Sequence, residues 1–222
     1  GIGTEQVERT VSELFPSARI ARMDLDTTGS KWAHFEILEA FRRQEVDVLL
    51  GTQMIAKGLD FPNITLVGVI NADVGLHIPD FRASERTFQL LEQVAGRAGR
   101  GEVAGEVLVQ TSRPNHDVLT RAVDHDYTGF VESELGSRME LGYPPFRRLA
   151  NLVITGSNEH AVTSTAENIA EWTGSLIRTR KLDGIEVIGP APCPIDRIRD
   201  RWRWHFLLKA EDPRTLGSVL RF

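Results

Sequence analysis

The residues best suited to chemistry lie near the middle of the chain, in Gln93-Val-Ala-Gly-Arg-Ala-Gly-Arg100. Arg97 and Arg100 are three positions apart, so a helix through this stretch would place both guanidinium groups on one face. The alanines and glycines around them leave room for another surface to approach. Two planar, permanently charged groups on such a face favour a polyphosphate ligand. The alternative is a pair of ordinary surface ion pairs.

A second polar stretch, Gly51 to Pro62, follows an apolar run. Gly58 permits a positive φ or a close backbone approach, and Asp60 could hold one of the two arginines or a nucleotide hydroxyl. Three further side chains, two uncharged donors and one cation, are suited to a DNA phosphate; they are Thr52, Gln53 and Lys57. The alternative is a plain turn with a solvated lysine.

Both stretches require a scaffold of alternating strands and helices. The apolar runs 46–50 and 64–70 each feed one polar loop, and in an open parallel sheet such loops form the ligand crevice. The remaining pattern predicts a helix over 3–14, a strand over 18–25, a helix to about 43, a helix of about 15 residues after Pro79, and a strand over 105–111. Residues 1–112 are therefore predicted to form one α/β lobe.

The pattern changes after this lobe. Residues 113–140 are helical in pattern, and Gly142-Tyr-Pro-Pro145 interrupts them. The rest predicts strands over 149–155, 185–188 and 204–208, a helix over 157–180 and a last helix from Asp212. Residues 113–140 are thus predicted to be a helical connector, and residues 141–222 a small α+β domain.

The ordered set of motifs resembles the superfamily 2 helicases, whose motif VI is similar to Gln93–Arg100 and whose motif V is similar to Gly51–Pro62. The longer pattern resembles the primosome assembly helicases over essentially all 222 residues. It comprises Gly3-Thr-Glu5, Asp24-Leu-Asp26, Pro79-Asp-Phe-Arg82, Glu85-Arg86, Gln110-Thr111, Pro144-Pro-Phe146, Gly189-Pro-Ala-Pro192 and Arg201-Trp-Arg203. The resemblance implies a RecA-like, parallel-sheet second helicase lobe followed by the α+β domain.

The resemblance also implies roles for the site residues. Arg97 and Arg100 would be arginine fingers at the γ-phosphate of ATP, which stabilise charge in the transition state. Gln93 would help to position the nucleotide or couple it to the Gly51–Pro62 loop. The phosphate-binding loop, the Mg²⁺-binding acidic box and the zinc-binding cysteines of these helicases would lie upstream, so the 222-residue chain alone is expected to be inactive.

The function implied is that of an ATP-dependent 3′→5′ DNA helicase in replication restart and primosome assembly. Its partners would be branched or single-stranded DNA at forks, primosome proteins and single-stranded-DNA-binding protein. Two alternatives stay open: another superfamily 2 translocase, such as a fork-reversing or nuclease-associated motor, and a catalytically silent DNA-binding adaptor. The intact finger motif disfavours the adaptor.

Charge is distributed unevenly along the chain. The net charge is −5 overall, −8 over residues 1–144 and +3 over residues 145–222. The C-terminal part also interleaves arginine with tryptophan, at Arg197, Arg199, Arg201, Arg203, Trp202 and Trp204. In a strand, the odd-numbered arginines would share one face and the tryptophans the other. We therefore expect the arginines to contact DNA backbone.

Other features set limits on the class of protein. A single cysteine, Cys193, excludes an internal disulfide framework and a cysteine-based zinc site in these residues. The chain has no apolar run of about 18 residues and no apolar leader, which predicts a cytoplasmic protein. Its abrupt ends suggest a piece of a longer protein.

Asp24 and Asp26 are not expected to form a metal site or a catalytic pair, since no third ligand is adjacent. Five charged residues before motif VI, Asp73, Asp80, Arg82, Glu85 and Arg86, are predicted to form a structural ion network.

Overall fold

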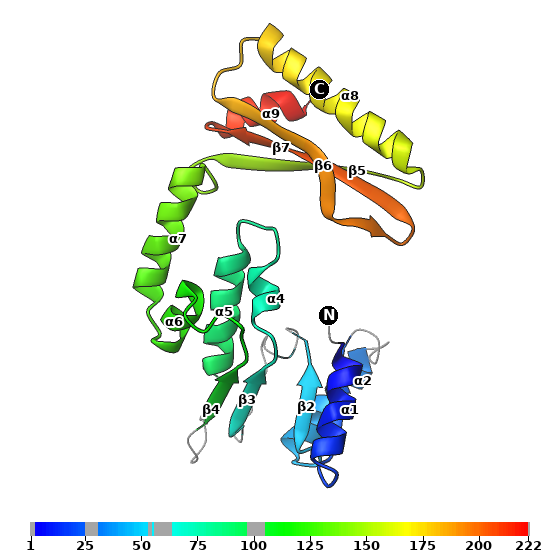
Figure 1. The fold of residues 1–222 in the computed structure, drawn as a ribbon, viewed down its shortest axis with the longest axis vertical. Helices are drawn as coiled ribbons and strands as arrows, with labels where there is room; N and C mark the ends of the chain where they lie inside the picture. The colour runs from blue at the N-terminus through cyan, green and yellow to red at the C-terminus, as the bar shows by residue number, and fades with distance from the viewer. Residues whose placement is uncertain (1–2, 25–30, 53–54, 56–63, 97–104, 222) are drawn as a thin grey trace. The chain divides into compact units, whose positions relative to one another are not determined.

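The computed structural model describes residues 3–24, 31–52, 55, 64–96 and 105–221, except the side chains of 31–33. The chain forms two compact units (Figure 1). The first comprises Gly1–Ile78 and Ala83–Asp126, and the second comprises Pro79–Arg82 and Tyr127–Phe222. The domain boundaries predicted at residues 112 and 140 stay predictions.

The N-terminal part of the first unit contains a pair of parallel strands. Its elements are α1 (Thr4–Leu14), β1 (Ile20–Met23), α2 (Lys31–Arg42) and β2 (Val48–Gly51). Parallel strands need a crossover connection, and α2 lies in the connection between β1 and β2. The register runs from Ile20 opposite Val48 to Met23 opposite Gly51, so both strands end together. Just before them, the Arg19 backbone N–H donates to the Asp47 carboxylate at 2.8 Å.

A second parallel pair completes the strands described in this unit. The elements are β3 (Leu66–Val69), α4 (Asp73–Leu76), α5 (Ala83–Ala95), β4 (Glu106–Val109) and α6 (Asp117–Val123), with β3 paired to β4. Residues of α5 at helical spacing are buried, namely Ala83, Thr87, Phe88, Leu91 and Val94. The parallel α/β arrangement predicted for the N-terminal part is confirmed, and α4 is an element that the sequence pattern did not predict.

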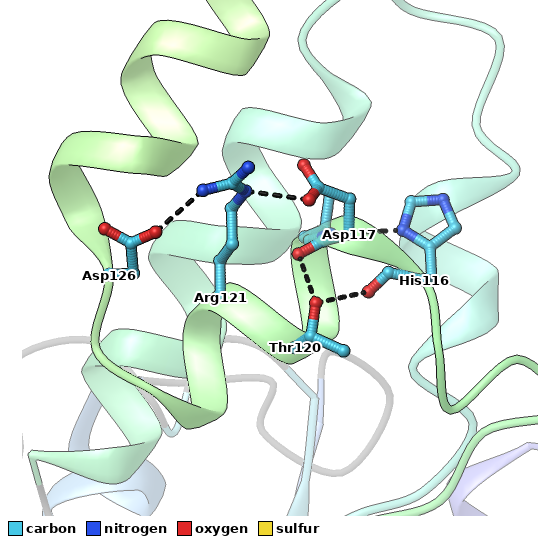
Figure 2. A network of polar contacts seen from close by, with 6 residues as sticks. His116, Asp117, Thr120, Arg121 and Asp126 are labelled. Carbon is cyan, nitrogen blue, oxygen red and sulfur yellow. Dashed lines mark hydrogen bonds and ion pairs between the residues drawn. The ribbon is translucent and has the colours of Figure 1, made fainter.

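Arg121 fixes the end of α6 and the turn that follows it (Figure 2). Its Nε lies 2.8 Å from Asp117 Oδ1, and its Nη1 lies 2.7 Å from Asp126 Oδ2. His125, between these partners, has a φ of +52°. The helical stretch expected over 113–140 is therefore two helices, α6 and α7 (Tyr127–Leu141), with this turn between them.

The second unit is built on an antiparallel sheet in the order β5-β7-β6. Its elements after α7 are β5 (Arg148–Gly156), α8 (Glu159–Thr179), β6 (Ile185–Ile198), β7 (Arg201–Ala210) and α9 (Pro213–Leu220). Figure 1 shows α8 and α9 along the same side of this sheet. The core of this unit includes Phe206, Leu208 and Ala210 of β7, which are 0–1% exposed. The predicted α+β domain is thus a three-stranded sheet with two helices on one face.

Candidate nucleotide and DNA sites

The predicted motif V loop starts at the paired carboxyl ends of β1 and β2. A Cβ atom on Gly51 would lie 2.5 Å from the Met23 carbonyl oxygen, so the close approach of the two strand ends requires glycine here. Thr52 follows and is exposed, and its carbonyl accepts a hydrogen bond from the Ile55 N–H at 3.0 Å. Thr52 is therefore the first polar side chain after the strand.

Most of the predicted nucleotide site lies outside the described residues. This holds for both arginine-finger candidates and for two loop residues, namely Arg97, Arg100, Gly58 and Asp60. Two of the predicted DNA-binding residues, Gln53 and Lys57, also lie outside the described residues. Their predicted roles stay predictions.

Gln93 lies in the last turn of α5 and is exposed, whereas its neighbours Leu91 and Val94 are buried. Helical spacing separates these positions, because the apolar face of α5 packs into the unit and leaves Gln93 on the other side. The end of the helix is also held by Glu92, whose Oε1 lies 3.1 Å from His125 Nδ1. Gln93 is thus presented from a fixed helix end, four residues before Arg97.

Asp73 lies just beyond the ends of β3 and β4, and within the described residues hydroxyl and amide groups, not arginines, donate to its carboxylate. Its carboxylate accepts hydrogen bonds from Ser112 Oγ at 2.6 Å, the Ser112 N–H at 2.8 Å and Thr111 Oγ1 at 2.5 Å. These donors, those of Ser112 first, lower the pKa of Asp73 to about 2. The prediction of arginine partners was wrong for Asp73, because its described donors are hydroxyl and amide groups distant in sequence, and the charge of His77 has only a smaller effect.

Two other carboxylates have structural partners. Asp80 does form the predicted ion pair with Arg82, with Nη2 and Oδ2 3.2 Å apart. Asp24 is buried and accepts a hydrogen bond from Thr4 Oγ1 at 2.6 Å, which joins the end of β1 to the start of α1. Within the described residues, no group of three histidine, cysteine, aspartate or glutamate side chains could hold a metal ion.

The four C-terminal arginines do not share one face. Arg199 forms the β6–β7 turn with Asp200, and both have a positive φ (48° and 60°), as a two-residue hairpin turn requires. This turn pairs Arg197 with Trp202, and directly opposite residues share a face. The Arg197 guanidinium accordingly lies 5.2 Å from the Trp202 ring centroid. The expectation that all four arginines share a face was therefore wrong.

Arg201 and Arg203 lie together on the sheet face opposite the core. Arg201 Nη2 donates to the Thr155 carbonyl and hydroxyl oxygens, each at 3.3 Å, and Arg203 Nη1 donates to the Ile195 carbonyl at 3.2 Å. These contacts use one nitrogen of each guanidinium, which has five N–H donors. The arrangement holds both charges over one surface and suits a phosphate backbone.

Polar and apolar side chains alternate around these arginines on the same face. Thr155 and Asn151 of β5 are exposed, and Val153 between them is 41% exposed. His205 Nδ1 lies 3.0 Å from Asn151 Oδ1. Burial, followed by the charge of Arg203, lowers the pKa of His205, so the ring is neutral at pH 7. The sequence alone did not point to Asn151, Thr155 or His205, because only the β5–β7 register brings them beside the arginines.

Comparison with known proteins finds one family in the N-terminal part of the chain and another in the C-terminal part. Residues 4–102 match the helicase conserved C-terminal domain, and residues 139–222 match the primosomal protein N C-terminal domain. The chain is 45% identical over 221 residues to the replication restart protein PriA of Bacillus subtilis, and all of it aligns. It belongs to the PriA family. The PriA proteins of Synechocystis and Haemophilus influenzae are 46% and 39% identical over 94% and 100% of the chain.

The match to PriA covers the C-terminal part of these proteins. The chain spans 27%, 25% and 30% of the lengths of the three relatives. The predicted fold class, a RecA-like second helicase lobe followed by a small α+β domain, is confirmed by the helicase match and the observed elements. None of the described helices has both the length and the hydrophobicity needed to cross a bilayer.

Proposed function

We propose that this chain is the C-terminal part of an ATP-dependent 3′→5′ DNA helicase that acts in replication restart and primosome assembly. The observation that carries the proposal is the succession, in one chain, of a helicase C-terminal domain and a primosomal protein N C-terminal domain. Relatives that align with this chain at 39–46% identity carry the name replication restart protein. The site of action would be the cytoplasm.

In this proposal the first unit completes an ATP site. Arg97 and Arg100 would stabilise charge on the transferred phosphoryl group, while Gln93, Gly58 and Asp60 would contact or position the nucleotide. The exposed position of Gln93 at the end of α5 supports this assignment. Bound Mg²⁺ supplies charge neutralisation on the phosphates. Its ligands, the phosphate-binding loop and the zinc-binding cysteines would come from outside these residues; Cys193, the single cysteine here, is buried.

The second unit would hold DNA. Arg201 and Arg203 present two cations beside exposed Thr155 and Asn151, a combination of charge and hydrogen-bonding groups that favours the phosphate backbone of branched or single-stranded DNA. Arg197 and Arg199 would contribute from the other face and from the turn. In the first unit, Thr52, Gln53 and Lys57 would contact a phosphate. Primosome proteins and single-stranded-DNA-binding protein are the proposed protein partners.

ATP hydrolysis by the intact protein tests this proposal. We expect hydrolysis that rises on addition of forked DNA, and strand separation in the 3′→5′ direction on a directional substrate. Hydrolysis stimulated equally by unbranched duplex, without strand separation, would favour another superfamily 2 translocase. A folded protein that binds DNA but does not hydrolyse ATP would be a DNA-binding adaptor.

A further inference from the structure

The segment Pro79–Arg82 packs with the second unit, although Ile78 before it and Ala83 after it belong to the first. The segment contains Phe81. The Phe81 ring stacks on Tyr143, which follows α7, with ring centroids 5.3 Å apart and an angle of 7° between the planes. A residue from the helicase part of the sequence is therefore built into the packing of the C-terminal unit.

A cation lies close to each ring of this pair. The Arg138 guanidinium is 5.1 Å from the Phe81 centroid, and Lys209 Nζ is 5.1 Å from the Tyr143 centroid. Both cations have further partners that fix them, because Arg138 Nη2 lies 2.7 Å from Glu134 Oε1 and Lys209 Nζ donates to the Leu141 carbonyl at 3.0 Å. Aromatic rings attract cations at this distance. We call these four residues, Arg138, Phe81, Tyr143 and Lys209, the aromatic stack.

The segment that carries Phe81 is held in shape by its own residues. Arg82 donates to Asp80 Oδ1 from its backbone N–H at 2.9 Å and from Nε at 3.2 Å, and its Nη2 reaches Oδ2. Its guanidinium also lies 5.3 Å from the Phe81 centroid. The next residue, Ala83, is the first of α5. The stack is thus joined to α5 by a short segment with a defined conformation.

Helix α5 leads from the stack to the proposed ATP site. It has 13 residues, so at 1.5 Å per residue it spans about 20 Å. Its buried face is fixed in the first unit, and Gln93 lies in its last turn, shortly before Arg97 and Arg100. A displacement of Ala83 would be carried along the helix to Gln93 in its last turn.

We propose that the aromatic stack couples DNA bound by the second unit to ATP hydrolysis. Lys209 of the stack lies on β7, the strand that carries Arg201 and Arg203. DNA held on β7 would bias the stack, and through α5 the placement of the residues at the ATP site. Phe81 is then a positioning residue, which touches neither nucleotide nor DNA. The inference rests on the proposed helicase function.

The test compares ATP hydrolysis by the intact protein with and without forked DNA. For Phe81→Ala we expect the DNA-stimulated kcat to fall about tenfold, while DNA-free hydrolysis and fork affinity keep their wild-type values. Phe81→Tyr retains a stackable ring and should restore stimulation. Phe146→Ala is the matched control, because Phe146 is 44% exposed and lies outside the stack. Tyr143→Ala removes the other ring and should reproduce the Phe81→Ala result.

Unchanged stimulation in both alanine variants would overturn the coupling role. An equal loss of DNA-free hydrolysis, stimulated hydrolysis and DNA affinity would also overturn it, since the stack would then only support the fold. A wild-type protein without DNA-stimulated hydrolysis would instead contradict the proposed function, and this inference with it. The wild-type measurement therefore separates the two failures.

Discussion

Three donors converge on the Asp73 carboxylate, and they stabilise its ionised form. The pKa of Asp73 in the folded protein is about 2, against about 3.9 in an unfolded chain. Because the folded-state pKa is the lower one, the ionised group stabilises the fold above about pH 4. That contribution is lost as the pH falls from about 4 to about 2.

We expect Asp73→Asn to lower the melting temperature of the first unit at pH 7, because an amide accepts these hydrogen bonds less strongly than a carboxylate. The difference from wild type should shrink as the pH falls from about 4 to about 2. Circular dichroism melts over a pH series measure this. Asp200→Asn is the control, since the Asp200 side chain is 92% exposed. A difference that stays constant over this pH range would show that the Asp73 charge contributes nothing.

At the same scale, Arg201 and Arg203 should contribute to DNA affinity through phosphate contacts. Each phosphate neutralised on duplex DNA contributes about 0.9 to the slope of log affinity against log salt. Replacing both arginines with alanine should therefore reduce that slope by about 2 and weaken binding similarly for different sequences. Fluorescence anisotropy with labelled DNA at several salt concentrations gives the slope.

Arg197→Ala is the matched variant for this measurement, because Arg197 faces Trp202 and Asp200 on the other side of the hairpin. It removes one positive charge where the double variant removes two, and we expect a change in slope of less than half that of the double variant. If the double variant keeps the wild-type slope while Arg197→Ala loses it, DNA is held on the tryptophan side instead. Thermal melts of each variant check that the second unit remains folded.

At the scale of elements, periodicity predicted most helices and strands, and failed where tertiary contacts decide. The break between α6 and α7 depends on Arg121 bonding to Asp117 and Asp126. The short helix α4 has four residues, too few for a periodic pattern. Strand β6, predicted over 185–188, continues to Ile198. Its pairing with β7 contains register shifts, which the alternation of polar and apolar residues along the sequence does not reveal.

The candidate site also has features that the sequence could predict and features that depend on long-range contacts. The order of the motifs singled out Gln93, which the structure shows to be exposed in the last turn of α5, while the finger roles of Arg97 and Arg100 stay predictions. The faces of the C-terminal arginines depend on the turn at Arg199 and on the register with β5, which are long-range properties. The alternation of side chains along a single strand could not predict that Arg197 lies on the opposite face of the sheet from Arg201 and Arg203.

Strand β7 also carries the main prediction about stability. Phe206 is 1% exposed and packs in the core beneath α8 and α9. Phe206→Ala should lower the free energy of unfolding of the second unit by about 3–5 kcal/mol, through lost burial and a residual cavity. Urea titration followed by tryptophan fluorescence measures this, because Trp172, Trp202 and Trp204 lie in that unit.

Val153→Ala is the control on the opposite face of the same sheet, where the side chain is 41% exposed. We expect it to cost less than about 1 kcal/mol. Equal losses for the two variants would mean that the second face is also covered in solution.

At the scale of the whole molecule, the chain would supply one half of the proposed ATP site. The 222-residue chain alone should therefore bind nucleotide feebly and show no hydrolysis above that of a mock preparation. A phosphate-release assay at high protein concentration measures this, with the intact protein as the positive control. Turnover by the isolated chain would show that its own residues hold the phosphates.

The most direct test of the central claim is Arg100→Ala in the intact protein, with ATP hydrolysis and ATP binding measured side by side. A finger acts mainly on the transition state, so kcat should fall roughly 10³-fold or more while the Kd for a non-hydrolysable ATP analogue stays near its wild-type value. Arg113→Ala, which removes an exposed arginine beyond β4, should leave both quantities unchanged. Full hydrolysis by Arg100→Ala, or an equal loss of binding and turnover, would contradict the assignment of this chain as the finger-bearing half of the motor.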